Sequence, residues 1–91
     1  MLVVVCYDIP KDQRRTQVMQ CLKNFGRHVQ YSVFECDLTP AQLELLRRRL
    51  RSLLHPPVDS VRLYFLSEDD ARRTEVLCGR GVARDPILYL C

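Results

Sequence analysis

The sequence predicts a small α+β domain whose elements follow the order β-α-β-β-α-β. Three observations predict this class. The chain has 91 residues, 47% of them hydrophobic, which suffices for one folded domain and is too short for two. Strand-like apolar runs alternate with two segments of helical periodicity. Proline, glycine or acidic turns separate these segments from one another.

The first predicted strand is the apolar run from Leu2 to Tyr7. It shows no polar alternation, which is typical of a central strand covered on both faces. Asp8-Ile9-Pro10 ends it, because proline has no N–H for the ladder. A helix is predicted from about Asp12 to Phe25, with apolar residues at helical spacing and Gly26 as its C-terminal stop.

The middle of the chain predicts two short strands and a second helix. The segment from Val29 to Leu38 is rich in β-formers but interrupted by polar residues, which predicts two strands with a tight link near Tyr31 and Ser32. Thr39-Pro40 opens a helix that ends at His55-Pro56-Pro57. One arc of its helical wheel carries Leu43, Leu46, Leu50, Leu53 and Leu54.

The C-terminal third predicts mainly strands. Asp59 to Leu66 alternates in polarity as a strand does, and an acidic turn from Glu68 to Asp70 leads to a short strand from Glu75 to Cys78. We expect residues 1–78 to form the domain. Residues 79–91 are expected to be a flexible connector and a last strand, from Ile87 to Leu90.

This order is that of the ferredoxin-like fold, in which two helices cover one face of an antiparallel sheet. The other face would be open to water, although the first strand is apolar on both sides and Tyr64 and Leu66 enlarge the uncovered surface. An exposed apolar patch of that size is an interaction surface. We therefore expect a homodimer packed sheet to sheet and completed by the C-terminal strand, which also compensates for a small core.

The composition excludes several classes of protein. The five cysteines are odd in number and form no C-x-x-C pair, which favours free thiols in a reducing compartment over a disulfide framework or a zinc knuckle. The first apolar run has only six residues, too few for a signal or membrane segment. We expect a soluble cytoplasmic protein with no membrane partner.

The net charge of +3 is modest but unevenly distributed. Positive charge gathers from Ile9 to Phe34 and from Thr39 to Leu54, and 12 of the 14 basic residues are arginine, which binds phosphate with two hydrogen bonds. A solvated surface is the alternative interpretation. The predicted phosphate contacts to a nucleic acid are Arg14, Arg15, Arg27, Arg47, Arg48 and Arg51.

Asp8 is the strongest candidate for a catalytic or metal-binding residue, because it is a carboxylate placed directly after the apolar strand. The alternative is that it only caps the turn before Pro10. One carboxylate is too few for Mg²⁺, which requires octahedral oxygen ligands. Across a two-fold axis, however, two Asp8 side chains can share one ion that activates water against a phosphodiester. We therefore expect a site for Mg²⁺, or for another divalent cation, at Asp8.

Three blocks of sequence, together with Arg14-Arg15, carry a family likeness. Val4 to Pro10, Gly26 to Cys36 and Asp59 to Tyr64 resemble the Cas2 family of small CRISPR-associated adaptation proteins. The likeness implies a ferredoxin-like homodimer that bridges two dimers of the Cas1 integrase. Such a dimer holds foreign DNA for insertion into a CRISPR array, the step called spacer acquisition.

The same likeness implies a metal-dependent endonuclease that acts on single-stranded RNA or on double-stranded DNA, with Asp8 as metal ligand. Tyr7, Arg15, His28 and Phe34 match positions tied to activity in some members of the family. His28 stands where arginine is frequent, and a histidine is charged only part of the time near neutral pH.

Two functions of different classes follow from the sequence. The first is a Mg²⁺-dependent phosphodiesterase with its site on the dimer axis. The second is a non-catalytic scaffold whose arginines hold the duplex backbone and whose C-terminal segment docks the Cas1 integrase. A toxin-like RNA nuclease of the same architecture is a more remote third.

Overall fold

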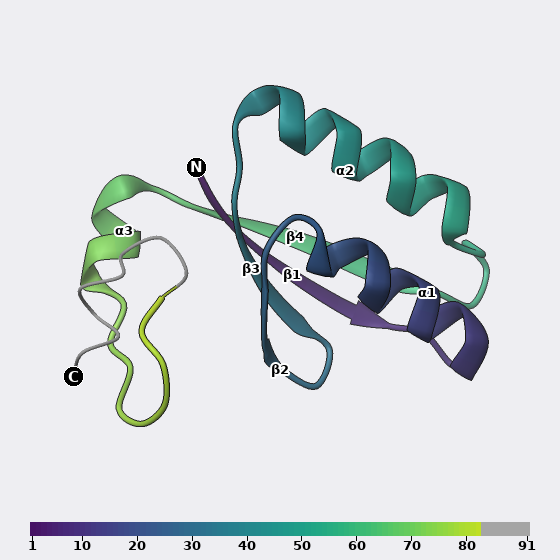
Figure 1. Cartoon of the computed structure of the whole chain (residues 1–91), viewed down its shortest axis with the longest axis horizontal. Helices are drawn as coiled ribbons and strands as arrows, with labels where there is room; N and C mark the ends of the chain where they lie inside the picture. The colour runs from purple at the N-terminus through teal and green to yellow at the C-terminus, as the bar shows by residue number, and fades with distance from the viewer. Residues whose placement is uncertain (83–91) are drawn as a thin grey trace.

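Two helices cover one face of a four-stranded antiparallel sheet, and a third, short helix lies beyond the end of the sheet (Figure 1). The computed structural model describes residues 1–82. The sheet order is β2-β3-β1-β4, so the α+β class and the ferredoxin-like order are confirmed. The elements are β1 (Leu2–Asp8), α1 (Asp12–Lys23), β2 (Arg27–Gln30), β3 (Val33–Asp37), α2 (Pro40–Leu53), β4 (Ser60–Leu66) and α3 (Glu68–Arg73).

The central strand is β1, as its apolar sequence predicts. It pairs with β3 on one side and β4 on the other, so that Val5 lies between Phe34 and Leu63. Side chains alternate along a strand, and the odd-numbered ones of β1 are buried against the helices. We call the other side of the sheet the open face. Its members include Leu2, Val4, Cys6, Asp8, Val33, Glu35, Arg62 and Tyr64.

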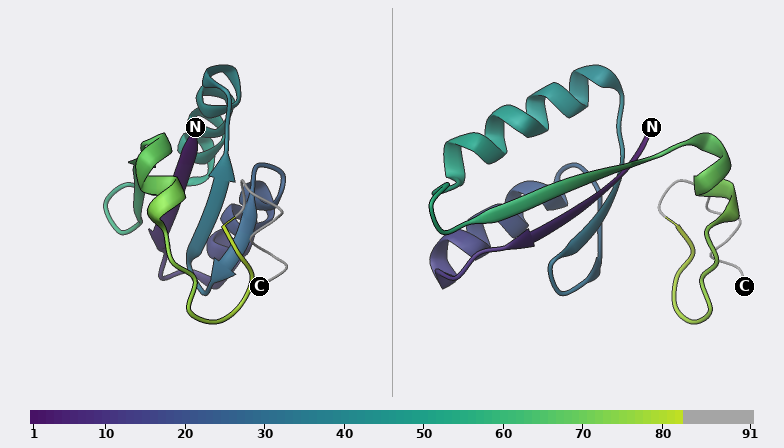
Figure 2. Two further views of the ribbon diagram at one scale, coloured as in Figure 1. Left: turned by 90° about the vertical axis from the view of Figure 1, so that its left-hand side faces the viewer. Right: turned by 180° about the vertical axis from the view of Figure 1, so that it is seen from behind.

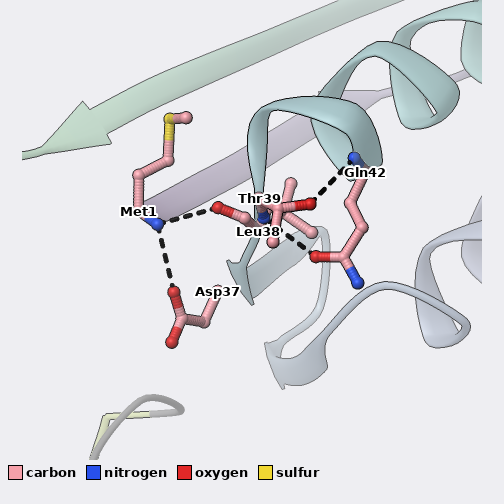
Figure 3. Close-up of polar contacts among 5 residues, drawn as sticks. All are labelled: Met1, Asp37, Leu38, Thr39 and Gln42. Carbon is pink, nitrogen blue, oxygen red and sulfur yellow. Dashed lines mark hydrogen bonds and ion pairs between the residues drawn. The ribbon is translucent and has the colours of Figure 1, made fainter.

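The core lies between the sheet and the two long helices. Apolar residues at helical spacing supply it, namely Val18 and Leu22 of α1 and Leu43, Leu46 and Leu50 of α2. The start of α2 carries a capping box, in which Thr39 and Gln42 each accept a hydrogen bond from the other's backbone N–H (Figure 3). The terminal amino group of Met1 donates to the Leu38 carbonyl at 2.8 Å, which fixes the start of β1 beside the start of α2.

The C-terminal third departs from the sequence prediction. The acidic residues expected in a turn are the first turn of α3, because the Ser67 hydroxyl caps that helix by accepting from the Asp70 N–H at 3.1 Å. Acidic residues at the start and arginines at the end suit the helix dipole. The predicted strand from Glu75 to Cys78 was wrong, since residues 74–82 form no ladder with the rest of the described chain. The strand expected from Ile87 to Leu90 lies outside the described residues.

Part of the open face is covered by the chain itself. Leu2 points to this face, yet it is fully buried, as are Ala71 of α3 and Val82. Figure 1 and Figure 2 show α3 and residues 74–82 at the end of the sheet where β1 begins, near the N-terminus. The other half of the open face stays accessible, and Tyr64 in it is 47% exposed. The accessible apolar part of the open face therefore lies toward the end that carries Asp8.

No helix within residues 1–82 has the length and apolar content needed to cross a membrane.

Candidate functional site

Asp8 ends β1 on the open face, opposite Ser60 of β4. Its side chain is exposed, and it makes no hydrogen bond or ion pair with any other residue of the described chain. The next residue, Ile9, is buried in the core and anchors the turn that follows. The carboxylate is therefore held by a rigid strand and is free to meet a ligand.

One chain alone offers an incomplete cation site. Within residues 1–82 there is no group of three or more histidine, cysteine, aspartate or glutamate side chains that could hold a metal ion. A carboxylate suits a hard cation such as Mg²⁺, which takes oxygen ligands and keeps several waters. Asp8 therefore fits such an ion only as one part of a site that a second chain or a phosphate completes.

Tyr7, His28 and Phe34 form a cluster on the helix side of the sheet. The Phe34 ring is fully buried, stacks on His28 with centroids 4.7 Å apart, and lies 6.4 Å from the Tyr7 ring. The Tyr7 hydroxyl donates to the Tyr31 carbonyl at 3.4 Å, and Nε2 of His28 lies 2.6 Å from the same oxygen. The cluster therefore holds the turn between β2 and β3.

The sheet separates this cluster from Asp8, because successive residues of a strand point to opposite faces. Phe34 and Tyr7 are buried, so they do not meet a substrate directly in this arrangement, and the catalytic role expected of them stays a prediction. Burial raises the pKa of the Tyr7 hydroxyl despite the opposing charge of Arg15, so it stays protonated near neutral pH and acts as a hydrogen-bond donor. His28 is exposed but lies on the same side as Phe34.

Arg15 is near the Asp8 turn and remains a candidate phosphate contact. One of its nitrogens, Nη1, donates to the Ile9 carbonyl at 3.0 Å, and the other, Nη2, pairs with Asp12. The side chain is still 42% exposed. Arg15 therefore supports the turn while keeping part of its guanidinium toward solvent.

Arg14 is engaged in an ion pair within the chain, and its predicted phosphate contact stays a prediction. Its Nε and Nη2 donate to the two carboxylate oxygens of Asp59 at 2.5 and 2.8 Å. Asp59 is 1% exposed and also accepts from the His55 N–H at 2.8 Å. The pair ties the start of α1 to the link between α2 and β4. Because the two residues are 45 positions apart, no sequence signal pointed to this contact.

We expect the Asp59→Asn variant to be less stable than the wild type at neutral pH, with a difference that shrinks in acid. The Arg14 hydrogen bond lowers the pKa of Asp59 in the folded protein. The stability it provides is therefore present above the unfolded pKa of about 4 and is lost as the pH falls through the lower folded value. Urea unfolding of both proteins at pH 7 and pH 3 measures this, and an equal difference at both pH values would contradict it.

Arg27 is also engaged within the chain, and its predicted role in nucleic-acid binding stays a prediction. Its Nη2 donates to the Gly81 carbonyl and lies 3.6 Å from Oε1 of Glu35. The side chain is only 17% exposed. One nitrogen of its guanidinium is therefore engaged within the protein.

The arginines of α2 divide into two groups. Arg47 pairs with Glu44 and lies over the Phe65 ring, and Arg49 lies over the Phe25 ring. Arg48 and Arg51 are exposed and form no ion pair with the described residues. Among the predicted phosphate contacts, Arg15, Arg48 and Arg51 thus remain the most accessible. Arg47 is partly engaged by Glu44 and Phe65.

The fold and the strand-end carboxylate define a ferredoxin-like domain with an exposed aspartate at the end of its central strand. The family model described as "CRISPR associated protein Cas2" matches residues 1–74. The protein named "CRISPR-associated endoribonuclease Cas2 3" from Chloroflexus aurantiacus is 45% identical over 91 residues, covering 99% of this chain and 97% of the relative. The chain therefore belongs to the Cas2 family.

Solved structures agree with this assignment. The crystal structure of Cas2 from Streptococcus pyogenes is 35% identical and superposes with a TM-score of 0.75, covering 86% of this chain and 100% of the other. A chain in a structure titled as a partial Cas6-RT-Cas1–Cas2 complex shares the fold with a TM-score of 0.71 at 23% identity, covering 84% of this chain and 89% of the other.

Proposed function

We propose that this protein is the dimeric, nucleic-acid-binding subunit of a cytoplasmic CRISPR adaptation complex, and that it carries a metal-dependent endonuclease site at Asp8. The observation that supports the proposal most is the exposed Asp8 carboxylate, which has no partner within the described chain and stands at the end of a rigid strand. The name of the Chloroflexus relative, an endoribonuclease, supports phosphodiester cleavage as the activity.

The proposed dimer brings two Asp8 residues to one interface. Val4, Cys6, Val33 and Tyr64 give the accessible half of the open face its apolar character, and Asp8 lies at its margin on the same strand as Val4 and Cys6. Two copies that bury this surface against each other about a two-fold axis place both carboxylates at the same interface. Two carboxylates brought together repel each other, which favours a bound cation between them.

The chain's own residues have distinct roles in the proposed cleavage. A bound divalent cation supplies Lewis-acid polarisation of the phosphodiester and makes a water more acidic. The paired Asp8 carboxylates hold that cation, and Arg15 binds a phosphate oxygen with the exposed part of its guanidinium. Hydrolysis adds the water oxygen to phosphorus and breaks one P–O bond, whose oxygen leaves with a proton. The substrate is single-stranded RNA or duplex DNA.

A second candidate function is a non-catalytic scaffold that bridges DNA to Cas1 dimers. Arg48 and Arg51 favour it, because they lie one turn apart on the outer side of α2, exposed and without an acidic partner in residues 1–82. Such arginines bind phosphates without regard to sequence, and their binding weakens as salt rises. A chain of the structure titled with both Cas1 and Cas2 shares this fold, which supports the proposal of this partner.

Binding and cleavage measured on the same preparations test the proposal. We expect the wild type to bind duplex DNA with an affinity that falls with salt, and to cut RNA or DNA only when Mg²⁺ is present. The Arg48→Gln and Arg51→Gln variants should each lower the salt slope of binding by about one. Arg73→Gln, an exposed arginine of α3, is the matched control and should leave the slope unchanged.

The outcomes separate the two functions. Cleavage that a chelator abolishes supports the nuclease, whereas strong binding with no cleavage of either substrate supports the scaffold alone. Absence of both binding and cleavage would contradict the proposed function as a whole.

A further inference from the structure

Tyr31 and Ser32 form the turn between β2 and β3, and Tyr31 is 96% exposed. Glycine, asparagine, aspartate and serine are the usual residues of turns, so turn geometry does not account for a tyrosine here. An aromatic ring left in water also forgoes the stabilisation that burial provides. Within residues 1–82, therefore, neither the turn nor the core requires this ring.

The backbone of this turn is fixed to the end of β1. The Tyr31 carbonyl accepts from the Tyr7 hydroxyl at 3.4 Å and lies 2.6 Å from Nε2 of His28. The Ser32 carbonyl accepts from the Tyr7 N–H at 3.0 Å. A tyrosine on a fixed backbone has only two side-chain torsions to restrict, so its ring loses little conformational freedom when a ligand binds.

The same contacts place the turn beside Asp8. Tyr7 is hydrogen-bonded to both turn residues, and Asp8 follows it directly as the last residue of β1. Cys6 is the last residue of β1 in the ladder with β3, so this ladder ends where the turn begins. A nucleotide whose phosphate meets Asp8 therefore has its base next to the turn.

A cavity of about 610 Å³ lies at the turn and is lined by residues 28–33. This volume is within the range of small-molecule sites. The ring of His28 stacks on the buried Phe34 at 4.7 Å, and His28 itself is exposed. The side chains of Gln30 and Ser32 hydrogen-bond to no other described residue. Aromatic rings with amide and hydroxyl groups suit a nucleobase, which stacks through its faces and hydrogen-bonds through its edge.

We propose that the Tyr31 ring is a stacking platform for an unpaired nucleobase next to the phosphate that meets Asp8, and that it selects single strands over duplexes. The bases of a duplex stack on one another and offer only their edges, whereas unpaired bases stack on protein rings. The inference rests on the proposed function, since it names the substrate class of the Asp8 site. Of the two proposed substrates, it assigns single-stranded RNA to that site.

Tyr31→Leu and Tyr31→Phe are a matched pair that tests stacking. Leucine keeps an apolar side chain but removes the aromatic face, whereas phenylalanine keeps the ring and removes only the hydroxyl. We expect Tyr31→Leu to bind a single-stranded oligouridine RNA about tenfold more weakly than the wild type, the effect of one lost base stack. Tyr31→Phe should bind it as the wild type does, and both variants should keep the wild-type affinity for duplex DNA. Fluorescence anisotropy in the presence of EDTA measures these affinities without cleavage.

Tyr31→Trp reports stacking directly, because the chain contains no tryptophan of its own. We expect the oligouridine RNA to quench the fluorescence of this variant and duplex DNA to leave it unchanged. Gln20→Trp, which places the reporter at an exposed position of α1, is the control and should respond to neither ligand.

Three results would overturn the platform. The first is an equal RNA affinity of the wild type and Tyr31→Leu, and the second is equal quenching of Tyr31→Trp by RNA and by duplex DNA. The third is a Tyr31→Leu protein that sediments as a smaller species than the wild type, because the ring would then pack against a second copy of the chain.

Cleavage with Mg²⁺, measured separately, distinguishes this inference from the proposed function. Quenching of Tyr31→Trp by RNA without cleavage by the wild type would contradict the proposed nuclease and leave the platform standing. Cleavage by the wild type together with unaltered RNA binding by Tyr31→Leu would support the nuclease and overturn the platform.

Discussion

Asp8→Asn is expected to lower Mg²⁺-dependent cleavage of the nucleic-acid substrate by at least about a hundredfold, since metal catalysis supplies several kcal/mol of transition-state stabilisation. Asparagine keeps the size of the side chain but lacks the charge that holds a divalent cation. In the proposed dimer the change removes two charges at once. Initial cleavage rates at matched protein and Mg²⁺ concentrations measure the effect.

The control for Asp8→Asn is Asp69→Asn. Asp69 is also an exposed carboxylate, but it pairs with Arg72 on α3, away from the end of β1. We expect this variant to cleave as the wild type does, and both variants to keep the wild-type circular dichroism spectrum. Full activity of Asp8→Asn would exclude Asp8 as the cation ligand.

Gly26→Ala is expected to destabilise the fold by at least about 3 kcal/mol, the upper part of the range for overpacked sites. A Cβ at this position would lie 2.3 Å from the Glu35 carbonyl oxygen and 2.4 Å from the sulfur of Cys36. The chain after α1 passes so close to β3 that only glycine fits. For a domain of this size the melting temperature should fall by roughly 15 °C, which thermal unfolding followed by circular dichroism measures.

A double variant distinguishes the two clashes at Gly26. Cys36→Ala removes the sulfur but leaves the Glu35 carbonyl, which is backbone and cannot be truncated. We therefore expect Gly26→Ala with Cys36→Ala to remain far less stable than Cys36→Ala alone. Recovery to the stability of Cys36→Ala would show that the sulfur, rather than the approach of the backbone, requires glycine.

The sequence predicted most of the fold because its strongest signals are local. The apolar run of β1 and the leucine arc of α2 each identify their element without reference to the rest of the chain. α3 was missed because Glu68 to Asp70 were interpreted as a turn, although Ser67 before them is a helix cap. The sequence thus contained the helix-capping signal of Ser67, but the general preference of acidic residues for turns pointed to the other interpretation.

The candidate site was predicted less completely, because tertiary contacts decide which charges are free. Arg14 and Arg27 resemble surface arginines in the sequence, but their partners Asp59 and Gly81 are 45 and 54 residues away. Phe34 is fully buried in the core, as the alternation of β3 allows but does not require. Asp8 could be predicted to be exposed, because it follows the last apolar residue of β1 and precedes a proline turn.

The most direct test of the shared cation site is the activity of a mixed dimer with one wild-type chain and one Asp8→Asn chain. Different affinity tags on the two chains allow this dimer to be purified free of both homodimers. If the two Asp8 carboxylates hold one ion, the mixed dimer should be nearly as inactive as the Asp8→Asn homodimer, because its site has lost one ligand. A mixed dimer with about half of the wild-type activity would mean that each chain carries an independent site, and would contradict the shared one.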